Sequence, residues 1–195
     1  MSKVLKIANA QAFWGDSLSA AASLVEQQPD IDFITMDFLA EVSLSIMAAQ
    51  KIKDASKGYA QDFIEVIKSL IPFWSSGTKV KIVSNAGGLN PYGCAAACVE
   101  ILQQARLPFK IAVIAGDDLL DQIKRDPKNS LFNHLDTHQP ISEVLSQLVT
   151  ANAYMGAKPL AEAIKQGADI VITGRVADPS LTVAPCVAYY DWSWT

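Results

Sequence analysis

Three polar residues at or just after the ends of short apolar runs have the chemistry of a catalytic site. Asp37 and Asn85 directly follow such runs, and Asp117 follows another after a single glycine. A carboxylate can act as a general acid or base or supply oxygen to a metal ion, and an asparagine amide can stabilise an enolate-like charge. We therefore expect Asp37, Asn85 and Asp117 to be the catalytic residues of an enzyme.

Two further features have the chemistry of an anion-binding site. Arg175 follows an apolar run, where a planar guanidinium can hold a carboxylate or phosphate through paired hydrogen bonds. Gly87 and Gly88 lie between another run and a helical segment, where backbone amides can bind an anion at the positive end of a helix. The alternatives stay open: Arg175 forms a structural pair with Asp178 or another acid, and the glycines only make a tight turn.

The remaining candidates are polar residues that we expect to bind substrate. Asn9, Asn152 and Asp178 can orient a ligand, and Tyr154 can donate a proton or a hydrogen bond, although a packed tyrosine is the commoner outcome. Short polar residues of this kind also fit helix N-caps, where the side chain accepts hydrogen bonds from free backbone amides. Capping alone is the competing interpretation for Asn90 and Asp178, because each precedes a proline at an expected helix start.

Other residues with metal or nucleophile chemistry fit structural roles better. Cys94 and Cys98 are one helical turn apart among alanines, and two thiols without further ligands do not make a zinc or iron–sulfur site. His134 and His138 lie in a polar stretch that indicates a surface loop. The P-loop pattern, the dinucleotide fingerprint and the G-x-S-x-G nucleophile elbow are absent. The sequence thus predicts no metal site and leaves the cofactor undetermined.

The apolar runs that precede the candidate residues predict strands. They lie at Val4–Ala8, Ile31–Met36, Val80–Ser84, Lys110–Ala115 and Asp169–Thr173. Segments of helical period between them predict helices at Ser17–Gln27, Phe38–Lys51, Tyr59–Leu70, Pro91–Ala105 and Ala157–Gln166. A polar loop at Lys124–Pro140 and a further helical stretch at Ile141–Thr150 complete the pattern.

Strands that alternate with helices predict an α/β fold. We expect three layers, a mainly parallel sheet with helices on both faces, which is Rossmann-like without the dinucleotide fingerprint. Ligands of open parallel sheets bind outside the carboxyl ends of the strands. The polar candidates, including Asn9 and Gln11 after the first strand, should therefore gather on one rim of the sheet.

Composition and charge narrow the function further. Half of the 195 residues are apolar and 18% are charged, which supports a packed core, and the net charge of −4 argues against nucleic acid as a partner. No apolar run reaches the roughly 18 residues of a membrane-spanning helix, so we expect no membrane partner. Three cysteines without a disulfide framework fit a reducing compartment. We therefore expect a cytoplasmic protein with a small-molecule substrate, and the sequence leaves a homo-oligomer open.

Aromatic residues crowd the stretch Tyr189–Thr195. Four large aromatic side chains in seven residues normally pack against something. We therefore expect residues 1–195 to form one N-terminal α/β domain that is truncated at its C-terminal end.

Five blocks that contain the candidate residues resemble one known family. They run in order along the chain as Ile7–Asp16, Thr35–Ser43, Ser84–Pro91, Ala115–Asp118 and Thr173–Ser180. Together they resemble the acyclic terpene utilisation (AtuA-like) family, of which this sequence is similar to the N-terminal portion.

The resemblance implies a bacterial-type cytoplasmic protein that takes part in the catabolism of acyclic isoprenoids such as citronellol and geraniol. Intermediates of that kind of pathway are branched acyl-CoA thioesters. Our hypothesis is a lyase or hydratase that acts on a branched acyl-CoA or a related carboxylic acid. The alternatives are a non-catalytic acyl-CoA-binding or assembly protein of the same pathway, and an inactive truncated gene product.

Overall fold

Parallel strands form one sheet in the computed structural model, which describes residues 4–194. The strands are β1 (Ile7–Gln11), β2 (Phe33–Met36), β3 (Lys81–Ser84), β4 (Ile111–Ile114) and β5 (Ile170–Thr173), and their order across the sheet is β1-β2-β3-β5-β4. β5 follows β4 along the chain but lies between β3 and β4. β2, β3, β4 and β5 all fall within the strands that the sequence predicts.

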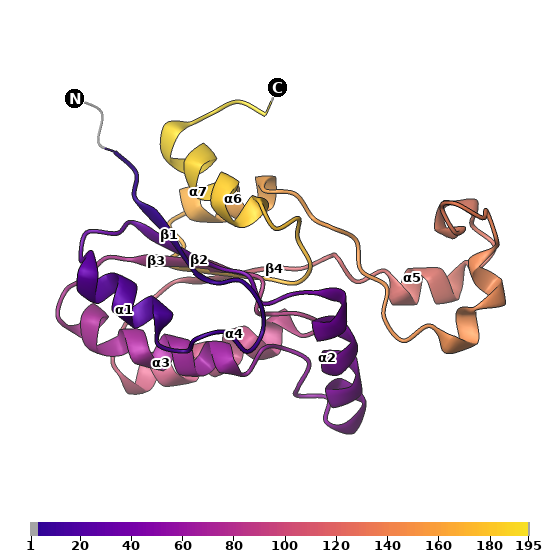
Figure 1. The fold of residues 1–195 in the computed structure, drawn as a ribbon, viewed down its shortest axis with the longest axis horizontal. Coiled ribbons are helices and arrows are strands. Elements are labelled where there is room, and N and C mark those ends of the chain that lie inside the picture. Colours follow the sequence, from indigo (N-terminus) through magenta and orange to yellow (C-terminus); the bar gives the residue numbers. More distant parts are fainter. Residues whose placement is uncertain (1–3, 195) are drawn as a thin grey trace.

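Helices cover both faces of this sheet. α1 (Ala20–Gln27), α3 (Asp62–Ser75) and α4 (Pro91–Gln104) lie on one face, and α6 (Lys158–Lys165) and α7 (Ser180–Tyr190) lie on the other (Figure 1). The predicted three-layer α/β fold with a parallel sheet is therefore confirmed.

Each face of the sheet holds its own apolar core. This explains why polar residues do not alternate with apolar residues along the inner strands. Ile82 and Ile172 pack with Phe63 and Leu70 in the core that α1, α3 and α4 cover. Val83, the next residue after Ile82, belongs to the core that α6 and α7 cover. Successive side chains of a strand point to opposite faces, so a strand that is buried on both sides must be apolar throughout.

β1 begins and ends three residues later than predicted. The expected strand Val4–Ala8 stops before Asn9, but β1 continues through Asn9 to Gln11. Asn9 is tolerated in this edge strand because its side chain is hydrogen bonded: Oδ1 accepts from the Thr35 hydroxyl (3.0 Å) and Nδ2 donates to the Gln11 carbonyl (2.9 Å). The expectation that Asn9 and Gln11 follow the strand is therefore wrong.

α2 (Glu41–Lys53) begins three residues later than the predicted helix start at Phe38. Phe38 and Leu39 are buried in an extended link between β2 and this helix. Because both residues are apolar, the sequence pattern places them in the helix, although their backbone is not helical. The link matters for the site because it runs across the carboxyl ends of the strands.

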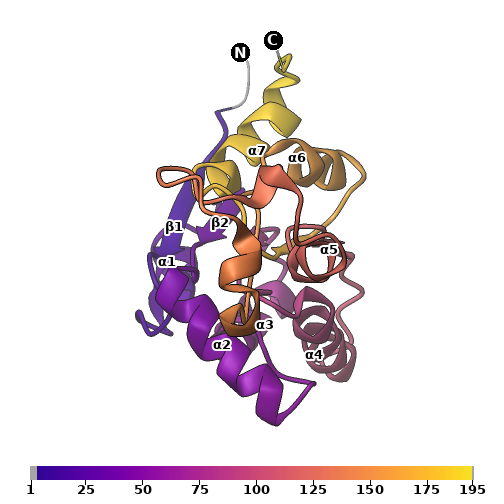
Figure 2. The same ribbon diagram turned by 90° about the vertical axis from the view of Figure 1, so that its right-hand side faces the viewer.

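The chain between β4 and α6 forms an arm beyond the carboxyl ends of the strands (Figures 1 and 2). It contains α5 (Leu120–Arg125) and the short 3-10 helices η1 (Ser130–Phe132), η2 (Ile141–Glu143) and η3 (Leu145–Gln147). The predicted helix at Ile141–Thr150 is wrong, because η2 and η3 have no buried residue that would hold a longer helix against the core.

α7 follows Asp178 and Pro179, where the cap-then-proline pattern places a helix start. It leads into the aromatic stretch, in which the rings of Tyr190 and Trp192 stack with their centroids 5.4 Å apart. Thr195, the last residue of the predicted aromatic tail, lies outside the described residues.

The strand order creates a switch point between β3 and β5. The chain leaves β1, β2 and β3 toward the face of α1, α3 and α4, whereas it leaves β4 and β5 toward the face of α6 and α7. The loops after the neighbouring strands β3 and β5 therefore diverge to opposite faces of the sheet. Ligands of open parallel α/β proteins bind at such a point.

Candidate functional site

The loops after four strands bring Asp37, Asn85, Asp117 and Arg175 to the carboxyl end of the sheet. Asp37 contacts Asn85, and Asp117 contacts Arg175. The two pairs are joined through Leu39, whose carbonyl accepts a hydrogen bond from Arg175 Nη1 (2.6 Å) and whose amide donates to Asp37 Oδ1 (3.1 Å). The sequence prediction of one polar rim is therefore confirmed for these four residues.

Asn85 holds the Asp37 carboxylate in a fixed orientation. Its Nδ2 donates to Asp37 Oδ1 (2.6 Å), and its Oδ1 accepts from the backbone amide of Phe38 (2.7 Å). The Asn85 side chain is fully buried, so both of its polar ends are engaged inside the protein. Asn85 therefore positions Asp37 and does not itself present a free group to a ligand.

Asp37 is a half-buried acid whose pKa lies above its ordinary value of 3.8. Burial raises the pKa because it disfavours the charged form, and the nearby Asp178 carboxylate adds to this. The hydrogen bonds from Asn85 and Leu39 and the positive charge of Arg175 act in the opposite direction. Those hydrogen bonds reach only Oδ1, so Oδ2 has no hydrogen-bond partner within residues 4–194.

Arg175 is buried, with only 4% of its surface exposed. Its Nη2 donates to the Tyr154 hydroxyl (2.8 Å), and its guanidinium carbon lies 4.2 Å from the centre of that ring. Nη2 also lies 3.4 Å from Asp178 Oδ1 and 3.9 Å from Glu41 Oε1. The alternative of a structural pair with Asp178 or another acid is therefore present in the structure, but both carboxylates are solvent exposed and screen the buried cation only in part.

Asp117 ties two loops together from a buried position. Its Oδ2 accepts hydrogen bonds from the backbone amide of Arg175 (2.7 Å) and from Asn152 Nδ2 (2.9 Å), and 3% of its surface is exposed. Gly174 makes this contact feasible, because a Cβ atom there would lie 2.3 Å from Asp117 Oδ1. The geometry gives Asp117 the role of positioning Arg175.

The segment from Ala151 to Met155 runs along the loops after β4 and β5. The Ala153 amide donates to the Asp117 carbonyl (2.7 Å), and the Met155 amide donates to the Arg175 carbonyl (3.2 Å). Asn152 and Tyr154 both join the rim as a result. The Tyr154 hydroxyl accepts from Arg175 and donates to Glu41 Oε1 (2.6 Å), which lowers the pKa of Glu41.

Gly87 and Gly88 form the turn after β3. The Gly88 amide donates to the Asn85 carbonyl (3.2 Å), so it is engaged within the turn and does not bind an anion there. A Cβ atom on Gly87 would lie 2.6 Å from the Thr173 carbonyl, so glycine permits the close approach of this turn to β5. The alternative of a tight structural turn accounts for both glycines.

Asn90 and Asp178 each precede a proline, and helix capping explains only Asn90. Asn90 Oδ1 accepts from the Gly93 amide (3.0 Å) at the start of α4, so its role as an N-cap is confirmed. Asp178 makes no such bond to α7, and its carboxylate lies against Arg175 instead. Asn9 hydrogen bonds within β1 and β2 and does not contact the cluster around Arg175.

A pocket of about 220 Å³ opens beside the cluster. It is lined by Glu41, Leu44, Ser45, Thr150, Ala151, Asn152, Tyr154 and Arg175. A second pocket of about 290 Å³ continues along α2, and Thr150 lines both. Both pockets combine polar groups with apolar side chains, which is a feature of small-molecule sites.

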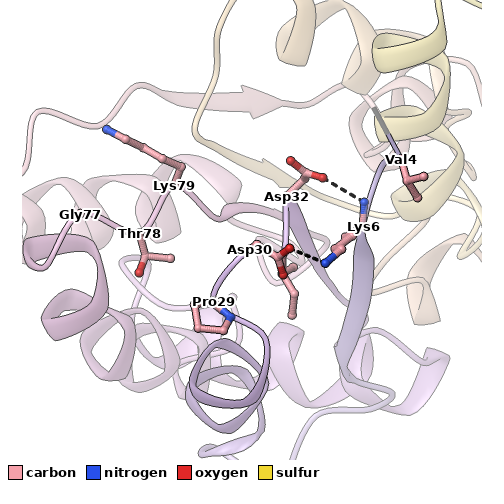
Figure 3. Close-up of a pocket in the computed structure, with 9 residues that line it drawn as sticks. Val4, Lys6, Pro29, Asp30, Asp32, Gly77, Thr78 and Lys79 are labelled. Carbon is pink, nitrogen blue, oxygen red and sulfur yellow. Dashed lines mark hydrogen bonds and ion pairs between the residues drawn. The ribbon is translucent and has the colours of Figure 1, made fainter. Parts of the chain in front are cut away.

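A larger pocket of about 470 Å³ lies near the amino ends of β1 and β2 (Figure 3). Two of its acids bond to Lys6: the Lys6 ammonium pairs with Asp30, and the Lys6 backbone amide donates to Asp32 Oδ2 (2.9 Å). No candidate residue lines this pocket, which is at the end of the sheet opposite to the switch point. The smaller pocket at Arg175 is therefore the candidate functional site.

Sequence reasoning does not identify Glu41 and Leu39 as parts of the site. Leu39 acts through its backbone carbonyl, which no residue pattern reveals, and Glu41 appears as an ordinary first residue of a helix. The one available signal is the block Thr35–Ser43, which contains both. Within the part of the chain that the structure describes, no three His, Cys, Asp or Glu residues are grouped so that they could hold a metal ion.

Burial of Asp37 makes stability depend on pH with a defined sign. The pKa in the folded protein lies above 3.8, so the folded chain binds this proton more tightly than the unfolded chain. Protonated Asp37 contributes stability that is present below pH 3.8 and lost as the pH rises through the raised pKa. We expect the free energy of unfolding of the wild type, relative to Asp37→Asn, to fall between pH 3.8 and neutral pH in urea denaturation. A difference that stays constant would contradict the raised pKa.

The fold and the polar cluster together define a class, a three-layer α/β protein with polar residues gathered at the switch point of a parallel sheet. A family model described as acyclic terpene utilisation family protein AtuA matches residues 5–195. The chain belongs to this family. Comparison with curated proteins and with solved structures gives no match. Among residues 4–194, no helix has both the length and the apolar character needed to cross a membrane.

Proposed function

We propose that the chain is an enzyme of acyclic isoprenoid degradation that acts on a branched acyl-CoA or a related carboxylic acid by a lyase or hydratase reaction. One observation carries this proposal. Asp37 is an acid with a raised pKa, it is fixed at Oδ1 by Asn85, and its Oδ2 has no hydrogen-bond partner in the described chain. These are the properties of a general base. Asp37 does not itself line the pocket; it is joined through Leu39 to Arg175, which does.

Hydration of a conjugated double bond shows how Asp37 would act. Its carboxylate takes a proton from water while the water oxygen bonds to the β-carbon of the substrate, and the π electron pair moves to the α-carbon and the carbonyl oxygen as an enolate. The protonated carboxyl group then returns the proton to the α-carbon. The product differs from the substrate by one water molecule, and the reverse sequence is the lyase reaction.

Arg175 supports the proposal because it supplies positive charge where the substrate carries or develops negative charge. Its hydrogen-bond acceptors are two neutral groups, the Leu39 carbonyl and the Tyr154 hydroxyl. The acids Glu41 and Asp178 lie near it but are exposed and can turn away. A substrate carboxylate or an enolate oxygen can then take their place beside the guanidinium.

A non-catalytic role is the second candidate, as an acyl-CoA-binding or assembly protein of the same pathway. This role is favoured because Arg175 and Asp117 already form hydrogen bonds within the protein. Arg175 bonds to the Leu39 carbonyl and Asp117 to the Arg175 amide, so both residues hold loops together. We place either activity in the cytoplasm, a location that the free thiols of Cys94, Cys98 and Cys186 support.

Incubation with candidate compounds separates the two roles. The chain is mixed with saturated and α,β-unsaturated branched acyl-CoA esters and with the free acids, and the mixture is followed by mass spectrometry. Gain or loss of one water supports the hydratase or lyase, whereas retention of an unchanged ligand supports the binding protein. A protein that neither retains nor changes any of them contradicts both.

Arg175→Gln should weaken binding of the carboxylic acid about 10- to 100-fold, because charge-assisted hydrogen bonds contribute about 1.5–3 kcal/mol. Isothermal titration calorimetry measures the change, and Arg175→Lys should recover only part of it because lysine lacks the planar fork. Arg106→Gln is the matched control. Arg106 is exposed, follows the end of α4, and does not contact the cluster around Arg175. Equal affinities for Arg175→Gln and the wild type would remove Arg175 from the binding site.

A further inference from the structure

The pockets beside Arg175 and along α2 share Thr150 and are lined by successive residues of α2, so together they define one groove. The side chains of α2 that line it are Glu41, Leu44, Ser45, Ala48, Lys51 and Ile52. They recur at the spacing of a single helix face, so one continuous side of α2 is the wall. From Glu41 to Ile52 this wall is about 16 Å long, at about 1.5 Å per residue.

The two ends of the groove differ in chemistry. One end holds the buried guanidinium of Arg175, and the middle is lined by Leu44, Ala48, Ile52 and Val149. The far end also holds the exposed side chains of Asp118 and Asp121, and Lys51 Nζ donates to the Leu89 carbonyl (2.7 Å). The groove therefore offers a cation to the head of a ligand and apolar surface to its chain.

Glu41 shows that a carboxylate fits at the charged end. Its Oε1 lies 2.6 Å from the Tyr154 hydroxyl and 3.9 Å from Arg175 Nη2, although 80% of its side chain is exposed. Because the Glu41 side chain is exposed, another carboxylate can replace it. A ligand carboxylate that replaces Glu41 leaves its own chain directed toward Leu44 and Ala48.

We propose that this groove binds the carboxylate of an extended, acyclic fatty acid at Arg175 and Tyr154 and the chain along α2, with Ala48 as the residue that sets the chain length. The inference rests on the proposed function and adds the direction of the ligand and its specificity residue. Ala48 is suited to this role because it is the smallest side chain of the α2 wall and lies one helical turn beyond Leu44, so the groove stays open there.

Chain length is the variable that tests the proposal. Affinities for butanoate and decanoate are measured by calorimetry on the wild type and on Ala48→Phe. The wild type should prefer decanoate by at least tenfold, because each buried methylene adds roughly fourfold in affinity. Ala48→Phe should lower decanoate affinity at least tenfold and change butanoate affinity less than twofold.

Ala49→Phe is the matched control, because Ala49 is the exposed neighbour of Ala48 and does not line the groove. Val149→Phe narrows the same groove from the exposed opposite wall, so it should reproduce the Ala48→Phe result without altering a buried position of α2. If decanoate binding is unchanged in both groove variants, or if the wild type binds both acids equally, the groove assignment is overturned while the proposed function stands. If the wild type binds neither acid nor any acyl-CoA, both are overturned.

Discussion

Asp37→Asn should reduce turnover of the proposed acyl substrate by about 10²- to 10⁴-fold, the usual contribution of a general base. Asparagine keeps the shape of the side chain and can still accept the hydrogen bonds of Asn85 and Leu39. Binding of the substrate should therefore change little, so kcat falls while KM stays nearly constant. Steady-state kinetics with a hydratable branched acyl-CoA ester measures both values.

Glu65→Gln provides the control for this result. It makes the same change of a carboxylate to an amide, but Glu65 is an exposed residue of α3 that pairs with Lys68. Its turnover should equal that of the wild type. If Asp37→Asn also keeps full turnover, the base is another group, and Asp37 serves only to fix the link between β2 and α2.

Gly174→Ala should lower the free energy of unfolding by about 2–4 kcal/mol. The new methyl group would lie 2.3 Å from Asp117 Oδ1 and 2.5 Å from Oδ2, so the carboxylate must move. It then loses its hydrogen bonds to the Arg175 amide and to Asn152, and these buried groups are left without partners. Urea denaturation followed by circular dichroism measures the change.

Gly156→Ala is the matched control, because a Cβ atom there meets nothing within 4 Å. It should leave stability within about 1 kcal/mol of the wild type. A double-mutant cycle sharpens the test: in an Asp117→Ala background the clash is gone, so Gly174→Ala should cost much less. An equal cost in both backgrounds would show that the strain does not come from Asp117.

The sequence predicts the sheet well where strands are buried on both faces. Residues such as Ile82, Val83 and Ile170 form uninterrupted apolar runs because each side chain enters a core. The pattern fails at the sheet edge, where Asn9 satisfies its polar groups within the strand and so belongs to it. It also cannot predict that β5 inserts between β3 and β4, because alternation of strands and helices does not determine the order of the strands.

The candidate site could be predicted only in outline. Polar residues after parallel strands must meet on one rim, which places Asp37, Asn85, Asp117 and Arg175 together. Their partners could not be predicted, because the bond from Arg175 to the Leu39 carbonyl spans 136 residues and depends on a backbone atom. For the same reason, the sequence could not distinguish a free Asn85 from one that is fully engaged in holding Asp37.

The insertion of β5 between β3 and β4 affects how the chain folds while it is being synthesised. β1, β2 and β3 can pair once residue 84 has emerged from the ribosome, but among the described strands β4 has no neighbour until β5 is made. During that interval β3 presents an open edge of unpaired backbone groups, which invites association with other nascent chains. The sheet and the candidate site are thus both completed only when β5 is made. We expect the nascent chain to depend most on chaperones while residues 115–169 are being translated.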